Sequence, residues 1–435
     1  MLSGKDVAIL GMMIFSLFLG AGNIIFPPME GYQAGNLWFW GALGFLVTGV
    51  FMPFITLIVV TLKGRGEALS VDLPKWAHVT FWTILYLVIG STFAMPRVTN
   101  VAYEMAWQPL NLISGEYSHI IFATVFNLIG MSFMLGRSTM ISSIGKFMAP
   151  TLLVLLVIVA FQVIHAPLSP VVEPSGAYQD HSAVATGLIS GYQTMDVLSA
   201  MAFGGIVARA LAVKGVSDNR AIVRYTLTAG TVSVVLLSLL YFCLFYLGAT
   251  GEQVAKTSSN GGQLFAQYVN ALFGREGSWI MSGIVLLASL TTLVGVTSAC
   301  ADYFSKFHPR LNYPFFVVLF TISTIIISET GLNTLLRITI PALLLIYPIA
   351  IMLVAMQLLR EKLGISRNGF GLIIGVTALF SILDSLKNME LLPHFIQTML
   401  DKIPLHQEGL TWLLPTLLTM MLTILVKGKK QHKSQ

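Results

Sequence analysis

The chain has 435 residues, of which 55% are apolar and only 10% are charged, and its mean hydropathy is +0.80. Because soluble domains carry about 25% charged residues, this composition excludes an ordinary soluble domain and predicts an all-α polytopic membrane protein. The net charge of +6 would suit nucleic acid, but the basic residues are scattered through short loops. We therefore interpret them as topology signals, and expect membrane lipid and no nucleic acid as partners.

About twelve segments approach the roughly 20 apolar residues that a membrane-spanning helix needs. A single transmembrane domain should therefore occupy residues 1–435, and its short eleventh segment is the weakest of the set. The stretch Ala249–Ser278 contains Gly, Ser, Thr and Asn, which predicts an irregular loop outside the membrane. The expected spans are 6–26, 38–62, 78–98, 119–136, 146–165, 184–210, 222–248, 279–303, 312–328, 333–358, 369–386 and 409–426.

The lysine and arginine residues alternate between the loops on the two sides of the membrane. With a cytoplasmic N-terminus, 19 of the 25 lie in cytoplasmic segments and six lie on the outer side. Cytoplasmic loops of membrane proteins carry such an excess of positive residues. The pattern predicts a multi-pass protein of the cell (cytoplasmic) membrane with both termini cytoplasmic.

The first span is interrupted. Its apolar run breaks off into Gly20-Ala21-Gly22-Asn23 and ends in Phe26-Pro27-Pro28. Glycine costs roughly 1 kcal/mol in a helix interior, and a bilayer offers no water to freed backbone groups. Close helix packing through small residues is the alternative. Two glycines, an asparagine and two prolines together favour a broken helix beside a transporter binding site near the bilayer midplane.

The sixth span carries a similar interruption, in which glycines flank Tyr192-Gln193-Thr194-Met195-Asp196. The two interrupted spans are five apart, so they cross the membrane in opposite directions. This relation predicts a 5+5 inverted repeat with broken helices 1 and 6. Repeat one would occupy about 6–165, repeat two about 184–358, and peripheral helices about 369–426.

Asp196 lies near the middle of the sixth span. An ionised side chain at that depth costs about 2.5–3.5 kcal/mol on insertion scales, so Asp196 should either meet a cation or carry a proton. A structural, hydrogen-bonded carboxyl is the alternative. Gln193 and Thr194 would add polar contacts, and Tyr192 and Met195 would line an apolar pocket.

The eighth span holds several hydroxyl side chains, Thr291, Thr292, Thr297 and Ser298. Hydroxyl and carbonyl oxygens suit a hard cation such as sodium. The alternative is ordinary bonding to neighbouring helices or to the helix's own carbonyls. A face of this helix is shared by residues at a 4-3-4 spacing, Thr291, Gly295, Ser298 and Asp302. Combined with a broken first span, this face favours an ion site.

Arg97 and Glu104 are seven residues apart near the outer end of the third span, on one face if the helix continues. They would form either an outer gate or a structural ion pair, and we favour the ion pair. Asp384 in the eleventh span is expected at the membrane interface. The eight histidines show no ligand spacing and no nucleophile triad occurs, so we expect neither an enzyme nor a bound cofactor.

Four motifs, in order along the chain, resemble those of one transporter family. They begin with Phe18-Leu19-Gly20-Ala21-Gly22-Asn23-Ile24-Ile25-Phe26-Pro27-Pro28 and continue with Pro96-Arg97 and Tyr103-Glu104, Gly191 to Asp196, and Ala299 to Phe304. The chain thus resembles the branched-chain amino acid:cation symporters (BrnQ-type, LIVCS) over essentially its whole length. That family looks like part of the LeuT-type transporter superfamily, whose 5+5 repeat agrees with the topology above.

The resemblance implies positions for substrate and ion. Substrate would bind at Gly20, Ala21, Gly22 and Asn23 and at Tyr192 to Asp196. In LeuT-type sodium sites, carbonyls of the first span face hydroxyls of the eighth. Transfer of that pattern implies sodium ligands at the carbonyls of Ser16, Leu19 and Val294 and the hydroxyls of Thr297 and Ser298. The arginine of the related outer gate is missing here.

The expected function is secondary active import of leucine, isoleucine and valine, coupled to a cation by alternating access. Sodium is the expected ion and a proton the alternative, as is another amino acid as substrate. A channel is disfavoured because isolated breaks, and no continuous polar rings, interrupt the spans. The order of preference among the three amino acids and the oligomeric state stay open.

Overall fold

The computed structural model describes residues 2–110, 115–136, 148–307, 310–406 and 409–432. This part of the chain is helical and contains no β-strand. Eight of its helical stretches are at least 18 residues long and apolar enough to cross a membrane, and three shorter apolar helices accompany them. The chain is therefore a multi-pass membrane protein, while the count of twelve spans stays a prediction.

Each of the first five expected spans coincides with helices of the structure, and residues 146–147 of the fifth lie outside the described part. Three of the five consist of two helices with an irregular turn between them. The helices are α1 (Gly4–Phe18), α2 (Ala21–Ala34), α3 (Trp38–Leu46), α4 (Met52–Lys63), α5 (Lys75–Leu87), α6 (Ala94–Ala102), α7 (Ser118–Leu135) and α9 (Ala149–His165).

The next five spans also coincide with helices, and short helices lie between them. The sixth span again consists of two helices. The elements are α10 (Ala177–Asp180), α11 (Ala183–Ser190), α12 (Asp196–Val213), α13 (Asn219–Ala249), α14 (Glu252–Ala255), α15 (Gly261–Phe273), α16 (Arg275–Phe304), α17 (Tyr313–Ser328) and α18 (Leu332–Leu363).

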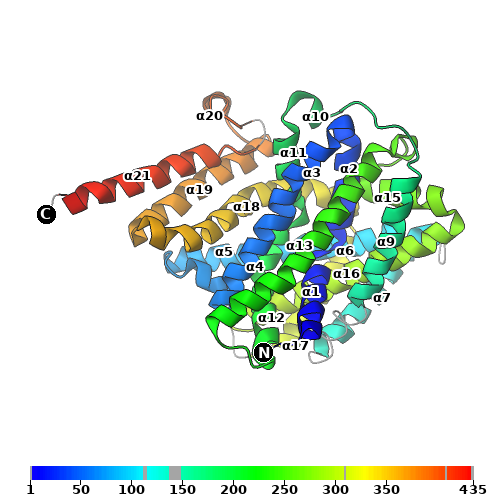
Figure 1. The fold of residues 1–435 in the computed structure, drawn as a ribbon, viewed down its shortest axis with the longest axis horizontal. Coiled ribbons are helices and arrows are strands. Elements are labelled where there is room, and N and C mark those ends of the chain that lie inside the picture. The colour runs from blue at the N-terminus through cyan, green and yellow to red at the C-terminus, as the bar shows by residue number, and fades with distance from the viewer. Residues whose placement is uncertain (1, 111–114, 137–147, 308–309, 407–408, 433–435) are drawn as a thin grey trace.

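The last part of the chain lies beside this bundle. It consists of α19 (Arg367–Asn388), α20 (His394–Leu400) and α21 (Leu413–His432). In Figure 1 α19 and α21 extend to the left of the upright α1, α4 and α13, with the C-terminus at the far left, and α19 packs on α18 and α21. This packing buries Asp384 of α19, and its expected position at the membrane interface stays a prediction.

The first span does not end at its two prolines, as the sequence suggested. Helix α2 continues through Pro27 and Pro28 to Ala34. A proline removes one backbone hydrogen bond, a loss that membrane helices tolerate when neighbouring helices cover it. Here α13 does so: a Cβ atom on Gly31 would lie only 2.0 Å from the Phe245 carbonyl oxygen.

The stretch from Ala249 to Ser278 was wrongly predicted as an irregular loop, since it contains α14 and α15. Asn260 caps α15 by accepting a hydrogen bond from the backbone of Gln263 at 2.9 Å. The helix buries Leu264, Phe265, Tyr268 and Val269 along one face. A capping residue followed by apolar residues at helical spacing was the signal that could have identified it.

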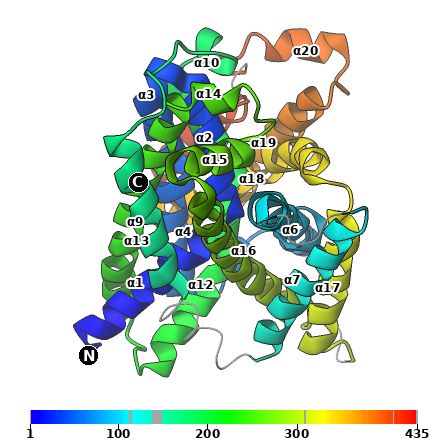
Figure 2. The same ribbon diagram turned by 90° about the vertical axis from the view of Figure 1, so that its right-hand side faces the viewer.

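The two broken spans make reciprocal contacts (Figure 2). Both halves of the first span, α1 and α2, pack on α13, and both halves of the sixth, α11 and α12, pack on the second span through α3 and α4. Glycines allow the close approach, as at Gly187, whose Cβ would lie 2.0 Å from the carbonyl oxygen of Gly41. Matching contacts of the first and sixth spans are what an inverted repeat would produce. The boundaries of the repeats stay a prediction.

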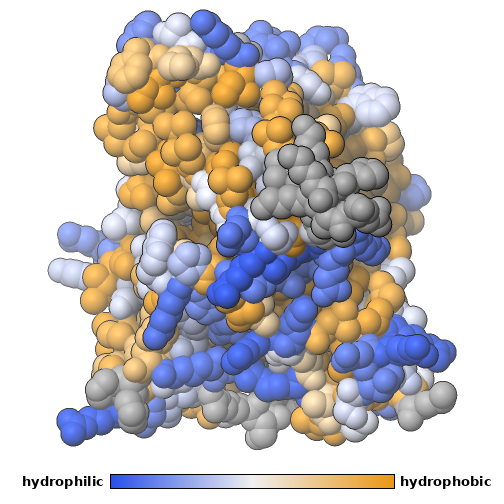
Figure 3. Space-filling model, turned by 90° about the vertical axis from the view of Figure 1, so that its left-hand side faces the viewer, coloured by the Kyte–Doolittle hydropathy of each residue, from blue (hydrophilic) through white to orange (hydrophobic). Residues whose placement is uncertain are grey.

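The surface is divided by polarity. Figure 3 shows hydrophobic residues over much of the upper half of one face and hydrophilic residues gathered below them. Many large apolar side chains are exposed, among them Val154, Phe161, Ile326 and Leu422. On a membrane protein such side chains face lipid, so their exposure needs no docking partner.

Candidate substrate and ion site

The first helix break lies at Leu19 and Gly20. The Gly20 amide donates to Asn23 Oδ1 at 3.0 Å, and the Asn23 amide donates to the Gly20 carbonyl at 3.2 Å. These bonds replace the regular helical pattern and leave the Leu19 carbonyl outside it. A Cβ atom on Gly20 would lie 2.8 Å from Thr292 Oγ1, so the absence of a side chain lets the break approach α16.

The second break lies between α11 and α12. A tight 3-10 turn, Gly191–Thr194, follows α11, and Met195 then adopts a left-handed conformation with φ of 62° before α12 begins. Thr194 Oγ1 donates to the Gly191 carbonyl at 2.8 Å, which satisfies a backbone group freed by the break. The turn aims Asp196 toward the first break.

A polar network joins the two breaks. Asn23 Nδ2 donates to Asp196 Oδ2 at 2.6 Å and also to the Tyr241 hydroxyl of α13. Asn23 and Asp196 are 1% and 3% exposed, so these bonds lie in a dry environment where they are strong. Sequence alone suggested both residues, and the structure brings them together.

A third break, which the sequence analysis missed, lies in the third span. Gly90 has non-helical angles (φ −89°, ψ −137°) between α5 and α6. The chain resumes as α6 with Arg97 almost fully buried. Arg97 Nη1 donates to the Gln193 carbonyl at 3.0 Å, and its guanidinium lies 5.3 Å from the Phe26 ring centroid. A lone glycine was the only sequence signal for this break.

Arg97 and Glu104 do not form the expected ion pair within the described residues. Arg97 points to the broken turn of the sixth span, whereas Glu104 accepts a hydrogen bond from Asn260 Nδ2 at 3.3 Å. Six helical residues separate them, but a π-helical turn, Tyr103–Trp107, follows α6 and shifts the register. Arg97 therefore lies in the central site, whereas Glu104 contacts the residue that caps the start of α15.

The three breaks surround one narrow cavity with a volume of about 20 Å³. Opposite charges face it, from Arg97 and Asp196, and most of the remaining wall is apolar. Arg97 Nε is buried without a hydrogen-bond partner among the described residues, so the guanidinium has an unused donor here. The lining residues are Leu17, Phe18, Gly20, Gly22, Asn23, Ile89, Ala94, Met95, Arg97, Val98, Thr194, Met195, Asp196, Ser199, Thr292 and Val296.

Some predicted substrate residues lie elsewhere. Tyr192 stacks on Tyr347 of α18, with ring centroids 4.2 Å apart, and does not line the cavity. Gln193 contributes its backbone carbonyl to Arg97 and is not a lining residue. Ala21 begins α2. The Tyr192 ring is buried against α18.

Oxygen atoms of α16 meet the end of α1. Thr291 Oγ1 lies 3.2 Å from the Ser16 carbonyl oxygen and 2.9 Å from that of Ala288. Thr292 Oγ1 bonds the Ala288 carbonyl at 3.0 Å and lies beside Gly20. These carbonyl and hydroxyl oxygens form a neutral oxygen cluster between the end of α1 and α16.

The expected ion ligands on α16 stay a prediction, and they lie apart from this oxygen cluster. Ser298 Oγ hydrogen bonds with the Tyr313 hydroxyl of α17 at 3.1 Å, so it faces α17. The Thr297 hydroxyl is buried without a partner among the described residues. Val294, Thr297 and Ser298 have the same i, i+3, i+4 spacing as Ala288, Thr291 and Thr292, but they lie six residues further along α16. Spacing alone could not distinguish the two sets.

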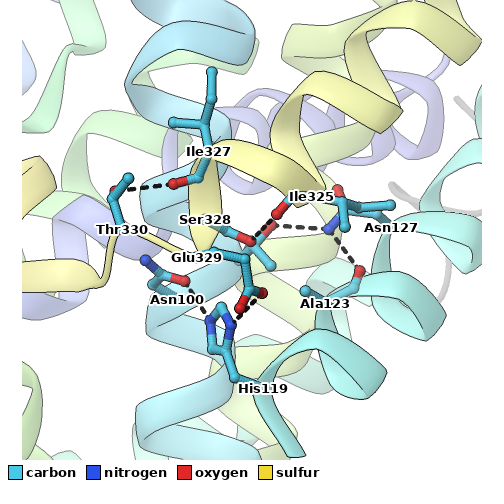
Figure 4. A network of polar contacts seen from close by, with 10 residues as sticks. Asn100, His119, Ala123, Asn127, Ile325, Ile327, Ser328, Glu329 and Thr330 are labelled. Atoms are coloured by element: carbon cyan, nitrogen blue, oxygen red, sulfur yellow. Dashed lines mark hydrogen bonds and ion pairs between the residues drawn. The ribbon is translucent and has the colours of Figure 1, made fainter. Parts of the chain in front are cut away.

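A further network ties the Arg97 helix to its neighbours (Figure 4). His119 of α7 contacts Asn100 Oδ1 through Nε2 and Glu329 Oε1 through Nδ1, both at 2.7 Å. About two turns further along α7, Asn127 donates to Thr99 Oγ1 at 3.0 Å. Helices α6, α7 and α17 are thus linked within one turn of Arg97, which holds the guanidinium in position.

Helix α15 covers the other side of α2. A Cβ on Gly261 would lie 1.9 Å from the Ile25 carbonyl oxygen, so backbone packs directly on backbone. Burial raises the pKa of the Tyr268 phenol, which stays neutral and hydrogen bonds with Thr250 at 2.9 Å and the Leu168 amide at 3.2 Å. The segment that sequence reasoning treated as a loop is therefore an ordered cover of the site.

Solved structures share this architecture. The chain is similar to Mhp1, a nucleobase-cation-symport-1 family transporter whose structure is in a closed conformation with bromovinylhydantoin bound. The TM-score is 0.63 at 13% sequence identity, and the match covers 98% of this chain and 93% of Mhp1. A Na⁺-coupled sialic acid symporter gives a TM-score of 0.60 at 10% identity, covering 97% and 90%. The molecule therefore has the LeuT-like fold of membrane transporters.

The family is narrower than the fold. A family model described as branched-chain amino acid transport protein matches residues 3–430. The branched-chain amino acid permease BrnQ of Haemophilus influenzae is 59% identical over 435 residues, covering all of both chains. The BrnQ permease of Escherichia coli is 36% identical over 428 residues, covering 98% of this chain and 96% of that protein. The chain belongs to the branched-chain amino acid transport protein family.

Proposed function

We propose that this transporter imports leucine, isoleucine and valine together with sodium, by alternating access. The observation that carries the proposal is the narrow cavity with Arg97 and Asp196 on its wall and apolar side chains around them. A zwitterion with an aliphatic side chain matches this combination, because both of its charges gain a partner while its side chain meets apolar surface. The names of the relatives support the substrate class.

Each end of the substrate has a natural partner. The α-carboxylate would bind Arg97, whose planar guanidinium suits a carboxylate and retains an unused donor. The ammonium would bind Asp196 and nearby backbone carbonyls. The branched side chain would pack against Ile89, Met95 and Val98. Substrate binding would thereby neutralise two buried charges that are costly when unpaired.

Sodium would bind the neutral oxygen cluster between α1 and α16. Its ligands would be the carbonyls of Ser16, Leu19 and Ala288 and the hydroxyls of Thr291 and Thr292. An ion there would fix Gly20 and Asn23 and so prepare the cavity for substrate. Because Asn23 also bonds Asp196, ion binding and substrate binding would share one network, which is the physical basis of coupling.

The orientation follows from the positive residues of the loops, with both termini in the cytoplasm. External sodium would order the first break, substrate would enter, and the helix bundle would rock to open the cavity inward. No covalent chemistry is needed.

Equilibrium binding of labelled leucine to the purified protein tests the proposal. Leucine affinity should rise with sodium concentration, and isoleucine and valine should compete while glutamate and lysine do not. Matched double variants locate the ion: Thr291→Val with Thr292→Val should raise the sodium requirement, and Thr297→Val with Ser298→Ala should not. Leucine binding that ignores sodium would refute sodium coupling, and no leucine binding at all would refute the substrate assignment.

A further inference from the structure

The His119 ring lies between two oxygen atoms at the start of α7. Its Nδ1 is 2.7 Å from Oε1 of Glu329, which directly follows α17, and its Nε2 is 2.7 Å from Oδ1 of Asn100 on α6. Figure 4 shows the ring between these two side chains. Tyr103 packs edge-on against the ring, with ring centroids 4.8 Å apart. The ring therefore bridges α6 and α17.

The two contacts of the ring require two protons. A carboxylate and an amide oxygen are both acceptors, whereas a neutral imidazole has only one N–H to donate. The imidazolium form has two N–H groups and can donate to Glu329 and to Asn100 at the same time. The arrangement in the structure is therefore that of the protonated ring.

A neutral ring requires a different arrangement of Asn100. When Nδ1–H donates to Glu329, Nε2 becomes an acceptor, so the Asn100 amide must turn over to present Nδ2 to it. Asn100 is 1% exposed, and its Nδ2 has no hydrogen-bond partner among the described residues. The buried amide thus holds an unused donor, and loss of the proton from His119 would bring that donor into use.

The bridge acts on the part of α6 that carries Arg97. Asn100 lies about one turn after Arg97 on this helix. Hydrogen bonds of an imidazolium are roughly twice as strong as those of a neutral ring. The protonated ring therefore holds α6 more firmly than the neutral ring does. The His119 side chain is 21% exposed, so it can exchange protons with the solvent.

We propose that His119 is a positioning residue whose protonation raises the affinity for leucine. The protonated ring holds α6 so that Arg97 meets the substrate carboxylate, and the neutral ring loosens this hold. The inference rests on the proposed function, because it takes Arg97 as the partner of the substrate carboxylate. Leucine should consequently bind more tightly at low pH than at high pH.

Several ionisable groups surround the ring. Glu329 is at hydrogen-bond distance from it. Glu104, on the π-helical turn after α6, interacts with the ring through its charge. Glu329 is therefore the partner to change in a test. Other ionisable side chains at this end of the elements that adjoin α7 or pack on it are Tyr103, Glu116, Arg275 and Glu276.

Leucine affinity of the purified full-length protein, measured at a fixed sodium concentration, tests the inference. Imidazole changes its charge between about pH 5 and pH 8. The parent should bind leucine at least about fivefold more tightly at the low end of this range than at the high end, as is usual for coupled sites. His119→Gln can still hydrogen bond but cannot take up a proton, so its affinity should be the same at both ends.

A second variant and a control separate the bridge from other effects of pH. Glu329→Gln removes the charge that pairs with the protonated ring, so it should move the midpoint of the pH profile to lower pH. This variant also decides the outcome if His119→Gln does not fold. His165→Gln, the same change at an exposed histidine of α9, should keep the parent profile. A parent affinity that does not change with pH, or the parent profile in both bridge variants, would overturn the inference.

Hydrogen exchange of the α6 amides gives a readout that does not depend on leucine. After correction for the intrinsic effect of pH on exchange, Ala94–Ala102 should be better protected at low pH in the parent and equally protected at both ends of the range in His119→Gln. Equal protection in the parent would overturn the inference. A parent that shows this pH-dependent protection but does not bind leucine would support the bridge and refute the proposed function.

Discussion

Arg97 supplies the positive charge of the central cavity, and its replacement gives the most specific test of substrate orientation. Arg97→Gln should weaken leucine binding by about 10- to 150-fold, because a hydrogen bond between charged groups contributes roughly 1.5–3 kcal/mol. Arg275→Gln, at an exposed position outside the cavity, should leave the affinity unchanged. The measurement is a leucine binding isotherm for each variant. Equal leucine affinities of Arg97→Gln and Arg275→Gln would show that Arg97 does not bind the substrate.

Gly20 tests the close approach between the first break and α16. Its backbone is extended, with φ of −98°, so alanine is compatible with the conformation. The added Cβ would still meet Thr292 Oγ1 at 2.8 Å. Gly20→Ala should therefore raise the sodium concentration for half-maximal leucine binding by roughly tenfold, equivalent to ~1.4 kcal/mol.

The control for that change is Gly375→Ala in α19, where a Cβ would meet nothing within 4 Å. It should bind sodium and leucine normally. If Gly20→Ala needs the same sodium concentration as the parent for half-maximal leucine binding, the sodium ion does not bind at the first break.

The site could be predicted from sequence only where the signal was local. Gly20, Gly22 and Asp196 carry their own signal, because glycine and a buried carboxylate are expensive inside a membrane helix. The approach of Arg97 to Asp196 depends on how the third span packs against the sixth, and nothing in the spacing of residues encodes it. Likewise, Thr291 with Thr292 and Thr297 with Ser298 have the same spacing on α16. Only the contact of Thr291 with the Ser16 carbonyl distinguishes the first pair.

Helices of this molecule pack through glycine faces, and the contact between α2 and α13 is the clearest case. A Cβ on Gly31 would lie 2.0 Å from the Phe245 backbone, which cannot move aside as a side chain can. Gly31→Ala should destabilise the protein by at least about 2 kcal/mol, seen as a lower thermal midpoint in detergent. Gly205→Ala, where the Cβ would have an ordinary contact at 3.6 Å, should have little effect. Equal midpoints for the two variants would contradict this packing.

The element boundaries were predicted well where apolar runs ended in loops and poorly where tertiary contacts decided them. Pro27 and Pro28 seemed to end a helix, but α13 supports α2 beyond them. The break at Gly90 gave only one glycine as a signal. In each case a distant helix determined the local outcome.

At the scale of the whole molecule, the two broken spans pack together with α3, α4 and α13 in one group of helices beside the cavity. Every element that binds substrate or ion in our account belongs to a broken span or touches one. Movement of this group against α6 and α16, which line the rest of the cavity, would change access to it without unfolding either part. The central claim is therefore coupled transport through the cavity between Arg97 and Asp196.

Uptake of labelled leucine into proteoliposomes tests this claim most directly, with sodium and proton gradients imposed separately. The account predicts accumulation above equilibrium when the sodium gradient points inward, loss of accumulation when a sodium ionophore removes it, and no accumulation by Arg97→Gln. Equilibration of leucine without accumulation under either gradient would contradict coupled transport, and accumulation driven by the proton gradient alone would contradict sodium as the coupling ion.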